Sequence, residues 1–361
     1  MKRNIFFSRA PKDGVSTGRE MLSGLLWRVF NECVEGACRI DSPWQAQSPL
    51  KALLRGVRCW LDGLDRALVD ECISSFGDCS GTLFIDGSNY GRLAEDAKRR
   101  LPNATVITFF HNVEARFFWD GFLESRSPRS LIVAFCNYLA ERKAVANSDV
   151  LVFLNARDAD LARRIYRRSM GSSRIEIFPM CLEDRLEAVE TVTVAPTQPI
   201  FGLFVGGSFF ANVQGMKWFA ENVAPFLPCM TYVVGKGFEA YREELEGHDN
   251  ITVVGTVESV YDWYARAAFV ISPIFHGSGM KTKTAEAAQF GRPLLGTSEA
   301  FTGFEEHIGV LGLECTTPKD FIDGVARIVN GSLRFDAMEI RSVFVDNYSQ
   351  DAARRRMCAL L

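Results

Sequence analysis

Short runs of continuous apolar residues alternate with amphipathic segments along most of this chain, and this alternation restricts the fold more than any other feature. Residues 105–110 and 201–205 have no polar face, which is typical of parallel strands covered by helices on both sides. The strands predicted in this way are residues 4–8, 81–86, 105–110, 150–154, 175–178, 201–205, 231–234, 251–254, 269–272 and 293–296. The segments between them predict helices, including residues 19–33, 130–147, 214–223, 260–267 and 281–290. We therefore predict an α/β fold of doubly wound parallel sheets.

The chain has 361 residues, which is enough for about two domains. Residues 182–199 contain Glu, Thr and Pro without apolar periodicity, so we interpret them as a linker. We expect Rossmann-like domains over residues 1–182 and 183–340. The carboxyl ends of both sets of strands should then border a cleft, where sheets of this kind bind ligands. Residues 41–80 predict only short helical pieces.

Composition argues against several classes of function. Lys plus Arg number 41 and Asp plus Glu number 44, for a net charge of −3, so we expect no nucleic-acid partner. No apolar run approaches the roughly 20 residues of a membrane-spanning helix, and residues 1–10 lack the apolar core of a signal peptide. None of the ten cysteines pairs at two-residue spacing. They predict free, buried thiols in a reducing compartment rather than a disulfide framework or a zinc site.

The densest signal is a predicted strand that leads through a glycine-rich loop into a helix. Gly277 and Gly279 allow the backbone to approach a ligand closely, and the free amides at a helix start favour a phosphate group. Lys283 and Glu286 are three residues apart and share one helical face. Lys281 adds positive charge, and Glu286 is placed to accept hydrogen bonds from ribose hydroxyls. The alternative interpretation is an ordinary strand, loop and helix with a solvated Lys/Glu pair.

Residues 277–297 resemble the nucleotide-sugar signature of GT-B glycosyltransferases, specifically the family 4 retaining enzymes of the bacterial polysaccharide type. The shared pattern is a glycine-rich loop, a Lys three positions before Glu-Ala, and Gly-x-Pro before a strand that ends in Thr. Residues 204–219 are similar to the first strand and loop of the family's donor domain, and residues 254–264 to its base-binding strand and helix. Residues 111–114 resemble a His-Asn-Val-Glu stretch of the acceptor domain. The resemblance is specific over about residues 200–305 and local elsewhere.

The resemblance implies a GT-B fold with an N-terminal acceptor domain and a C-terminal nucleotide-sugar domain that face each other across a cleft. It also implies that a last helix, at about residues 341–361, returns to the first domain. The implied catalytic residues are His111, Lys283 and Glu286. The implied nucleotide-sugar contacts are Gly206, Gly207, Ser208, Val257, His276, Gly277, Ser278, Gly279, Met280, Lys281, Lys283 and Glu286. The implied acceptor or phosphate loop contains Gly14, Val15 and Ser16, and no metal or cofactor is implied beside the donor.

The chain departs from the family pattern at two places. Many members carry two acidic residues with seven between them; Glu286 matches the second, but Ser278 stands at the first position. A basic pair common in the first donor-domain loop would fall near Gly207 and Gln214, which are not basic. Lys281, Lys283 and backbone amides are therefore expected to meet the charge of a leaving diphosphate.

Two short stretches in the first half of the chain allow more than one interpretation: one contains His111 and Glu114, and the other contains Asp158 and Asp160. His111 follows the apolar run 105–110, so we expect its imidazole to point into the cleft and to position the donor sugar or the acceptor. Glu114 is expected either to orient His111 or to stabilise the start of the following helix. Asp158 and Asp160 have the spacing of a metal-binding pair. Because they precede an amphipathic helix, we interpret them as helix-start residues.

Basic residues also recur beside apolar ones on amphipathic stretches. Lys51, Arg55 and Arg58 lie among leucines, and Arg126 and Arg129 precede an apolar run. Such a face is suited to an anionic membrane that carries a lipid-linked acceptor. A solvated helix face is the alternative.

We predict a hexosyltransferase that moves a sugar from a nucleotide-diphosphate donor to a hydroxyl of a glycan acceptor, free or lipid-linked. The expected transfer retains the anomeric configuration and needs no metal. The expected location is the cytoplasm, with peripheral attachment to the inner face of the membrane left open. A nucleotide-sugar epimerase on the same fold and a non-catalytic glycan- or nucleotide-binding partner subunit are the alternatives.

Overall fold

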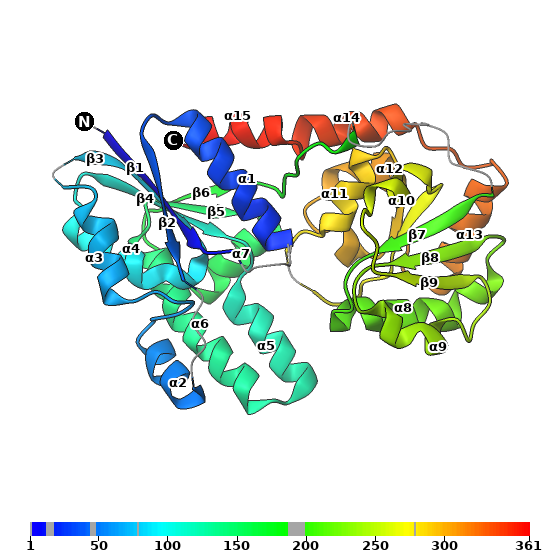
Figure 1. Ribbon diagram of the computed structural model, residues 1–361, viewed down its shortest axis with the longest axis horizontal. Coiled ribbons are helices and arrows are strands. Elements are labelled where there is room, and N and C mark those ends of the chain that lie inside the picture. The colour runs from blue at the N-terminus through cyan, green and yellow to red at the C-terminus, as the bar shows by residue number, and fades with distance from the viewer. Residues whose placement is uncertain (1, 12–17, 44–47, 78, 187–198, 278) are drawn as a thin grey trace. The chain divides into compact units, whose positions relative to one another are not determined.

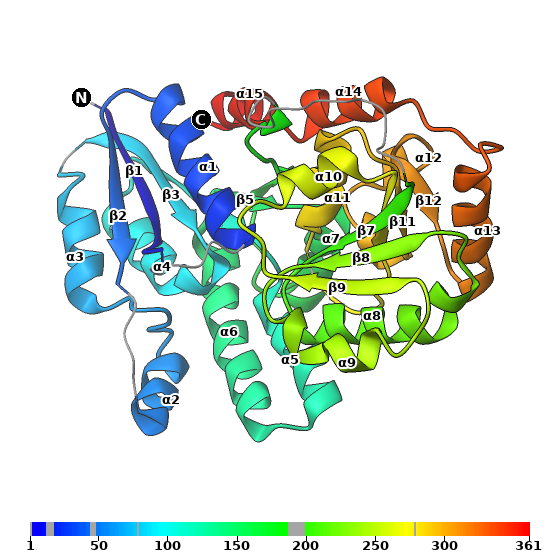
Figure 2. The same ribbon diagram turned by 45° about the vertical axis from the view of Figure 1, so that its right-hand side comes forward.

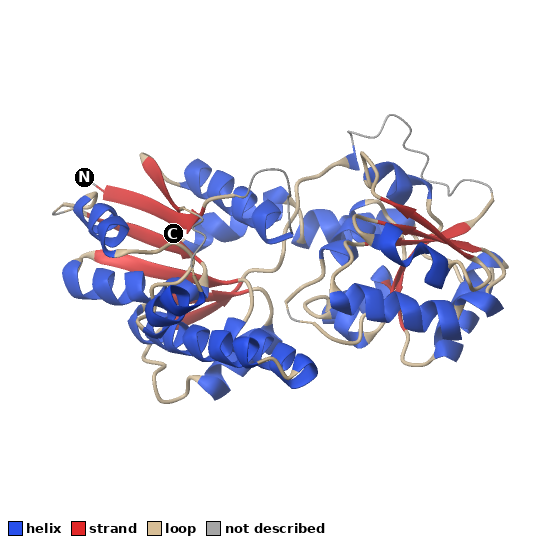
Figure 3. Cartoon of the chain, turned by 60° about the horizontal axis from the view of Figure 1, so that its bottom comes forward, coloured by secondary structure: helices blue, strands red, loops and turns tan. Residues whose placement is uncertain are grey.

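The computed structural model describes residues 2–11, 18–43, 48–77, 79–186, 199–277 and 279–361. The chain divides into two compact units: Met1–Pro179 with Ala353–Leu361 form unit 1, and Met180–Ala352 form unit 2. Within the described residues, each unit contains a six-stranded parallel sheet with helices on both faces (Figure 1 and Figure 3). No helix in these ranges is long and apolar enough to cross a lipid bilayer.

The sheet of unit 1 has the strand order β2-β1-β3-β4-β5-β6. Its strands are β1 Lys2–Arg9, β2 Ala37–Ser42, β3 Ser80–Asp86, β4 Ala104–Phe110, β5 Val150–Phe153 and β6 Arg174–Ile177. Its helices are α1 Gly18–Cys33, α2 Pro49–Val57, α3 Arg66–Ser74, α4 Gly91–Arg100, α5 Glu114–Ser125, α6 Pro128–Asn147 and α7 Ala156–Ile165, and α15 Gln350–Leu360 joins them from the other end of the chain. Helices α1 and α15 cover one face of the sheet, and α4 and α6 cover the other (Figure 1).

The apolar strands of unit 1 have no polar face because both of their faces are buried. Leu83 and Ile85 point into a core that they share with Leu93 of α4. On the opposite face, Phe6 and Phe84 stack with ring centroids 5.1 Å apart. A strand in the middle of such a sheet buries every side chain, so its sequence loses the polar alternation of a half-exposed strand.

The sheet of unit 2 has the strand order β12-β11-β10-β7-β8-β9. Its strands are β7 Phe201–Val205, β8 Met230–Val234, β9 Ile251–Gly255, β10 Phe269–Ser272, β11 Leu294–Gly296 and β12 Gly312–Glu314. Its helices are α8 Phe210–Asn222, α9 Arg242–Leu245, α10 Tyr261–Arg266, α11 Thr282–Gln289, α12 Ile308–Leu311, α13 Pro318–Val329 and α14 Ala337–Asn347. Figure 2 shows α8 and α9 on one side of β7, β8 and β9, with α10 and α11 on the other. Phe219 of α8 packs edge to face on Phe321 of α13, with ring centroids 5.9 Å apart.

The structure corrects three sequence-based predictions of secondary structure. Strand β2 was not predicted, because it is an edge strand in which only Ile40 and Ser42 are buried. The segment before residue 130 forms its own helix, α5, which pairs with α6 as a hairpin. The single last helix is wrong: α14 ends at Asn347, and the Ser349 hydroxyl accepts a hydrogen bond from the Ala352 amide at the start of α15. Serine favours such a helix start because its side chain satisfies an otherwise unpaired amide.

The expectation that all ten cysteines are free thiols is also wrong. Cys33, the last residue of α1, forms a disulfide with Cys358 of α15, 325 positions later. Both residues belong to unit 1, so the bond ties the two separate stretches of chain that make up this unit. The pairing escaped sequence analysis because the spacing of the two cysteines carries no sign of it.

The disulfide should stabilise unit 1 by restricting its unfolded chain. Cys33→Ser or Cys358→Ser should lower the free energy of unfolding by about 2–4 kcal/mol. Urea unfolding with and without a reductant measures this difference. Cys38→Ser is the control, because Cys38 is exposed and free. An equal loss in all three variants would show that the loss does not come from the bond.

Candidate functional site

Strands β7 and β10 are neighbours in the sheet of unit 2, and the chain leaves them in opposite directions. It continues from β7 to β8 on one side and from β10 to β11 on the other. In α/β proteins the loops after two such strands part from each other, and ligands bind at this point on the carboxyl edge of the sheet. The loop after β7 contains Gly206, Gly207 and Ser208, and the loop after β10 leads to α11.

Lys283, in the first turn of α11, reaches the loop after β7. Its Nζ atom donates a hydrogen bond of 2.9 Å to Oδ1 of Asn212 and lies 4.0 Å from the centroid of the Phe204 ring. The side chain is 8 % exposed. A Cβ atom at Gly206 would lie 3.2 Å from this Nζ atom, so the glycine leaves room for the ammonium group. The structure therefore brings together two stretches that the sequence singled out separately.

Burial has a direct effect on the charge of Lys283. It lowers the pKa of the ammonium group to about 7, and the nearby positive charge of Lys281 acts in the same direction. The carboxylate of Glu286 opposes the shift. Lys283 therefore changes its charge near neutral pH, whereas an exposed lysine keeps its charge.

Glu286 is also buried, one turn further along α11. Its Oε2 atom accepts a hydrogen bond of 2.8 Å from the hydroxyl of Tyr264 in α10. Burial raises the pKa of this carboxyl group, against the opposing effects of the Tyr264 hydrogen bond and the Lys283 charge. The Tyr264 ring is stacked on Phe290, with centroids 5.7 Å apart. Oε1 of Glu286 makes no hydrogen bond with another described residue, so it is available to a ligand.

Lys281 does not fit the expectation of a second free ammonium group. Its Nζ atom donates to Oε1 of Glu299 at 2.8 Å and to the carbonyl of Gly279 at 2.9 Å. A Cβ atom at Gly277 would lie 3.2 Å from Nζ of Lys281 and 3.4 Å from Oε1 of Glu299. The ion pair therefore holds the glycine-rich loop, and the charge of Lys281 is already largely balanced. Glu299 was missed because its role depends on a contact 18 residues away along the chain.

The other predicted donor-site residues differ in burial and in the loops that they belong to. Met280 is buried against Gly303, and His276 is exposed. Ser208 packs against Gly237, in the loop after β8. Val257 follows β9, two strands from β7, and is half-buried. Ser278 lies outside the described residues.

Glu239 is a second residue that sequence analysis missed. Its carboxylate accepts hydrogen bonds from the Gly237 amide at 2.8 Å and the Thr256 amide at 2.6 Å. Hydrogen bonds from Thr256 and Gly237 lower its pKa to about 2. The ionised side chain joins the loops that follow β8 and β9, next to Val257.

Unit 1 has a comparable point where the chain leaves neighbouring strands in opposite directions, between β1 and β3. Asp86, the last residue of β3, accepts a hydrogen bond of 2.8 Å from the Ser8 hydroxyl of β1. Its other oxygen lies 2.6 Å from Nε2 of His111, which follows β4. Burial opposes the charge of Asp86, but His111 and a hydrogen bond from Ser23 outweigh it and lower the pKa to about 2.

The structure corrects the expected surroundings of His111. The imidazole is 4 % exposed and packs on the Phe109 ring, with centroids 4.9 Å apart. Its partner is Asp86, not Glu114; Glu114 begins α5 and pairs with Arg19 at 3.6 Å. The Asp86 signal was present in the sequence as an acidic residue at the end of an apolar strand. The predicted loop residues Gly14, Val15 and Ser16 lie outside the described residues.

A buried carboxyl group holds the turn that follows His111. Glu141 of α6 accepts hydrogen bonds from the amides of Glu114 and Ala115 and from the hydroxyls of Ser88 and Tyr166. Burial raises its pKa to about 7 in spite of these bonds. Glu141 thereby fixes the start of α5, and its place in the middle of a helix gave no sign of this role.

The acidic pair Asp158 and Asp160 lies in the first half of α7, as expected. The Asp158 amide donates to the side chain of Asn155, which caps the helix, and Asp160 pairs with Arg163. Among the described residues, no three His, Cys, Asp or Glu side chains gather as metal ligands would.

Comparison with known proteins identifies the fold. The structure is similar to sucrose-phosphate synthase of Thermosynechococcus elongatus, with a TM-score of 0.69 and 12 % identity over 100 % of this chain and 98 % of that one. The structure is also similar to HepE of Anabaena, solved with UDP. The TM-score is 0.65, with 12 % identity over 100 % of this chain and 99 % of that one. WaaG, a glycosyltransferase involved in lipopolysaccharide biosynthesis, is similar with a TM-score of 0.65 and 16 % identity over 99 % of each chain. No curated protein sequence matches the chain.

The fold is therefore that of the GT-B glycosyltransferases, which confirms the fold class predicted from the sequence. Residues 201–331 match the family model of Glycosyl transferases group 1. The match lies within unit 2, so the sequence of this unit is similar to a glycosyltransferase domain of group 1.

The Asp86–His111 pair predicts a dependence of stability on pH. The pKa of Asp86 is about 2 in the folded protein and about 3.9 in an unfolded chain. The pair should therefore contribute about 2 kcal/mol above pH 4, and this contribution should disappear as the pH falls toward 2. The free energies of unfolding of the protein and of Asp86→Asn, measured with urea, should approach each other as the pH falls over this range. Asp120→Asn changes an exposed residue, so its free energy of unfolding should depend on pH in the same way as that of the unmodified protein.

Proposed function

We propose that this protein transfers a sugar from a nucleotide diphosphate to a hydroxyl group of a glycan acceptor, free or carried on a lipid, with retention of the anomeric configuration. The donor is proposed to bind at the carboxyl edge of the unit 2 sheet. The observation that carries the proposal is the buried Lys283 ammonium group, held between the loop after β7 and the start of α11. A buried cation beside a helix amino terminus is a strong attractor for a phosphate group.

Each part of the donor meets a matching group. The diphosphate accepts hydrogen bonds from Lys283 and from the first amides of α11, whose partial positive charge adds to that of the lysine. Glu286, fixed by Tyr264, offers its free Oε1 to the ribose hydroxyls. The Lys281–Glu299 pair holds the glycine-rich loop in place and is a positioning device. Lys281 was expected from the sequence to meet the charge of the diphosphate together with Lys283; in this proposal it instead holds the loop.

The proposed reaction needs no group beyond donor, acceptor and these side chains. The bond between the anomeric carbon and the diphosphate oxygen breaks, and the acceptor oxygen forms its bond to that carbon on the same face of the sugar. The acceptor proton passes to an oxygen of the departing diphosphate. Stabilising the developing negative charge is the main task of the protein, and loss of one such contact costs about 10²- to 10³-fold in rate.

Unit 1 is proposed to bind the acceptor, and His111 is proposed to position it. The hydrogen bond to Asp86 fixes the orientation of the imidazole, which suits a positioning role. The UDP bound by HepE makes a uridine diphosphate sugar the first donor to test.

The donor site can be tested by thermal shift against a panel of UDP-, GDP-, ADP- and TDP-sugars. A ligand that binds only the folded protein at about 100 times its Kd should raise the Tm by roughly 5 °C. Lys283→Ala and Glu286→Ala should each abolish the shift with the preferred donor. Incubation of that donor with glycan acceptors should then yield a glycoside that keeps the anomeric configuration of the donor.

The matched controls are Lys319→Ala and Glu314→Ala, which change exposed residues of the same unit. Both should keep the full shift. Unchanged shifts in the Lys283 and Glu286 variants would contradict the proposed donor site. An epimerised sugar formed from the donor alone would instead favour an epimerase, and binding without turnover would favour a binding subunit.

The lowered pKa of Lys283 predicts that the binding of nucleoside diphosphate depends on pH. The free protein loses the Lys283 proton near pH 7, whereas the bound phosphate keeps it on. The Kd of UDP, or of the diphosphate matching the preferred donor, should rise about tenfold from pH 6 to pH 8, and binding should take up a proton. Isothermal titration calorimetry in buffers of different ionisation enthalpy measures both quantities. Lys283→Arg should flatten the pH dependence, because arginine stays charged; an equally steep dependence in this variant would assign it to another group.

A further inference from the structure

Four polar side chains gather at the carboxyl edge of the unit 1 sheet. Arg9 is the last residue of β1, and Asn89 lies in the turn of 3₁₀ helix that follows β3. Strands β1 and β3 are neighbours, so the residues that follow them start side by side. Arg19 near the start of α1 and Asp62 between α2 and α3 complete the group. We call Arg9, Arg19, Asp62 and Asn89 the polar cluster.

Asp62 connects the members of the polar cluster. Its Oδ2 atom accepts a hydrogen bond of 2.5 Å from Nδ2 of Asn89 and lies 3.7 Å from Nη1 of Arg9. Its backbone carbonyl accepts a hydrogen bond from the hydroxyl of Ser42, the residue of β2 that is aligned with Arg9. The position of Asp62 is therefore fixed from the sheet as well as from the turn after β3.

One buried atom of the polar cluster lacks a partner. The side chain of Asn89 is 3 % exposed, and its Oδ1 atom makes no hydrogen bond within the described residues. A Cβ atom at Gly87 would lie 2.7 Å from this oxygen and 3.1 Å from Nη2 of Arg19, so the two groups lie against the same glycine. A buried amide oxygen without a donor is unfavourable. Asn89 thus marks a place for a group that donates a hydrogen bond.

The two arginine side chains are only loosely paired. Arg9 lies 3.7 Å from Asp62, and Nη1 of Arg19 lies 3.6 Å from Oε1 of Glu114. Both distances exceed that of a hydrogen bond, so neither ion pair uses the N–H donors of its guanidinium group. The two side chains are 31 % and 29 % exposed. They can therefore adjust to a ligand and donate hydrogen bonds to it.

The charges around Arg19 restrict the kind of ligand. Burial lowers the pKa of Arg19, but the carboxylates of Glu114, Asp86 and Asp62 outweigh this effect and raise it. Among the described residues, three carboxylates thus lie close to Arg19, and Arg9 is the second cation of the polar cluster. An anionic ligand would add to the negative charge already present. An ammonium group could not accept hydrogen bonds from the arginines. An uncharged ligand meets neither obstacle.

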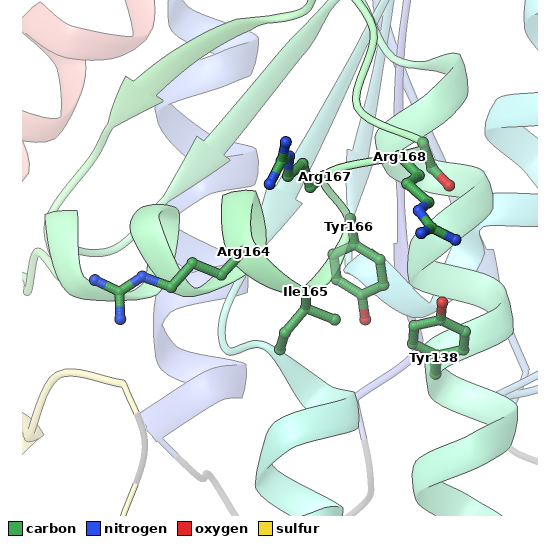
Figure 4. A pocket seen from close by; sticks show the side chains of 7 residues that line it. Tyr138, Arg164, Ile165, Tyr166, Arg167 and Arg168 are labelled. Atoms are coloured by element: carbon green, nitrogen blue, oxygen red, sulfur yellow. The ribbon is translucent and has the colours of Figure 1, made fainter.

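A pocket at the end of α7, of about 380 Å³, lacks this combination of groups. Figure 4 shows Arg164, Arg167 and Arg168 extending in different directions around Tyr166. The hydroxyl of Tyr166 already donates to Glu141, and no buried polar side-chain atom described around this pocket lacks a partner. The polar cluster is therefore the better candidate for a ligand site in unit 1.

We propose that the polar cluster binds an uncharged sugar ring of the acceptor through neighbouring hydroxyl groups. A hydroxyl group both donates and accepts hydrogen bonds. One hydroxyl can therefore donate to Oδ1 of Asn89 while it or its neighbour accepts from Arg9 or Arg19. A carboxylate or an ionised phosphate offers the arginines acceptors but has no matching donor for Asn89. That the ring belongs to the acceptor rests on the proposed function, whereas the binding of a sugar ring does not.

Saturation-transfer NMR tests the proposal without donor or reaction, because it detects weak binding of small sugars. The probes are the methyl glycosides of glucose, galactose, mannose and N-acetylglucosamine. At least one should bind, and inorganic phosphate at constant ionic strength should not displace it. Asn89→Leu and Arg9→Gln should each weaken this binding about tenfold. No binding of any glycoside, displacement by phosphate, or unchanged affinity in both variants would overturn the proposal.

Matched changes elsewhere in unit 1 serve as controls. Asn137→Leu alters another buried asparagine, whose Nδ2 atom donates to the carbonyl of Val133. Arg174→Gln alters an arginine that pairs with Glu176. Both variants should bind the glycoside like the unmodified protein. Circular dichroism shows that each variant is folded. If Asn89→Leu does not fold, Arg9→Gln gives the same test at a partly exposed side chain.

The outcomes separate this inference from the proposed function. Glycoside binding that the two variants weaken, without sugar transfer from any donor, would support the polar cluster as a sugar site and contradict the proposed transfer. Where transfer is found, Asn89→Leu should raise the KM of the acceptor about tenfold and leave the KM of the donor unchanged. Transfer with an unchanged acceptor KM in this variant would overturn the assignment of the polar cluster and leave the proposed function intact.

Discussion

The second unit is organised around one buried ammonium group. Lys283 can occupy its position only if β7, α8 and α11 meet, since it contacts Phe204 and Asn212 at once. A buried cation without a full counter-charge is unfavourable, and the low pKa of Lys283 is the visible result. In the proposed function, the phosphate of the donor supplies the missing charge. The burial that lowers the pKa of Lys283 in the free protein is, under that proposal, what suits the site to an anionic ligand.

The central strands of both sheets could be predicted from the sequence, because burial on two faces leaves a continuous apolar run. The edges could not. Strand β2 has a polar face, and in β12 only Gly312 is buried, so neither strand produces such a run. At the break between α14 and α15 the Ser349 hydroxyl accepts a hydrogen bond from the Ala352 amide, and Leu182 pairs with Ser349 from a distant part of the chain. The apolar periodicity on both sides hides this break.

The candidate site was predictable where its members are close in sequence. Lys283 and Glu286 lie on one helix, so their spacing fixes their common face. Contacts set by strand pairing were not predictable in this way: Asp86 meets His111 because β3 and β4 are aligned so that Asp86 pairs with Phe109. The Lys281–Glu299 pair likewise joins two loops, and sequence spacing gave no reason to bring an acid beside that lysine.

The composition of unit 1 from two distant stretches has a consequence for how the chain is completed during synthesis. Unit 2 is a contiguous segment, Met180–Ala352, and has all of its residues before α15 is finished. Unit 1 needs Ala353–Leu361 as well, and its covalent closure waits for Cys358. The synthesis of unit 1 thus starts first, but its disulfide can form only at the end. Unit 2 can fold in the interval, as a domain inserted into the sequence of unit 1.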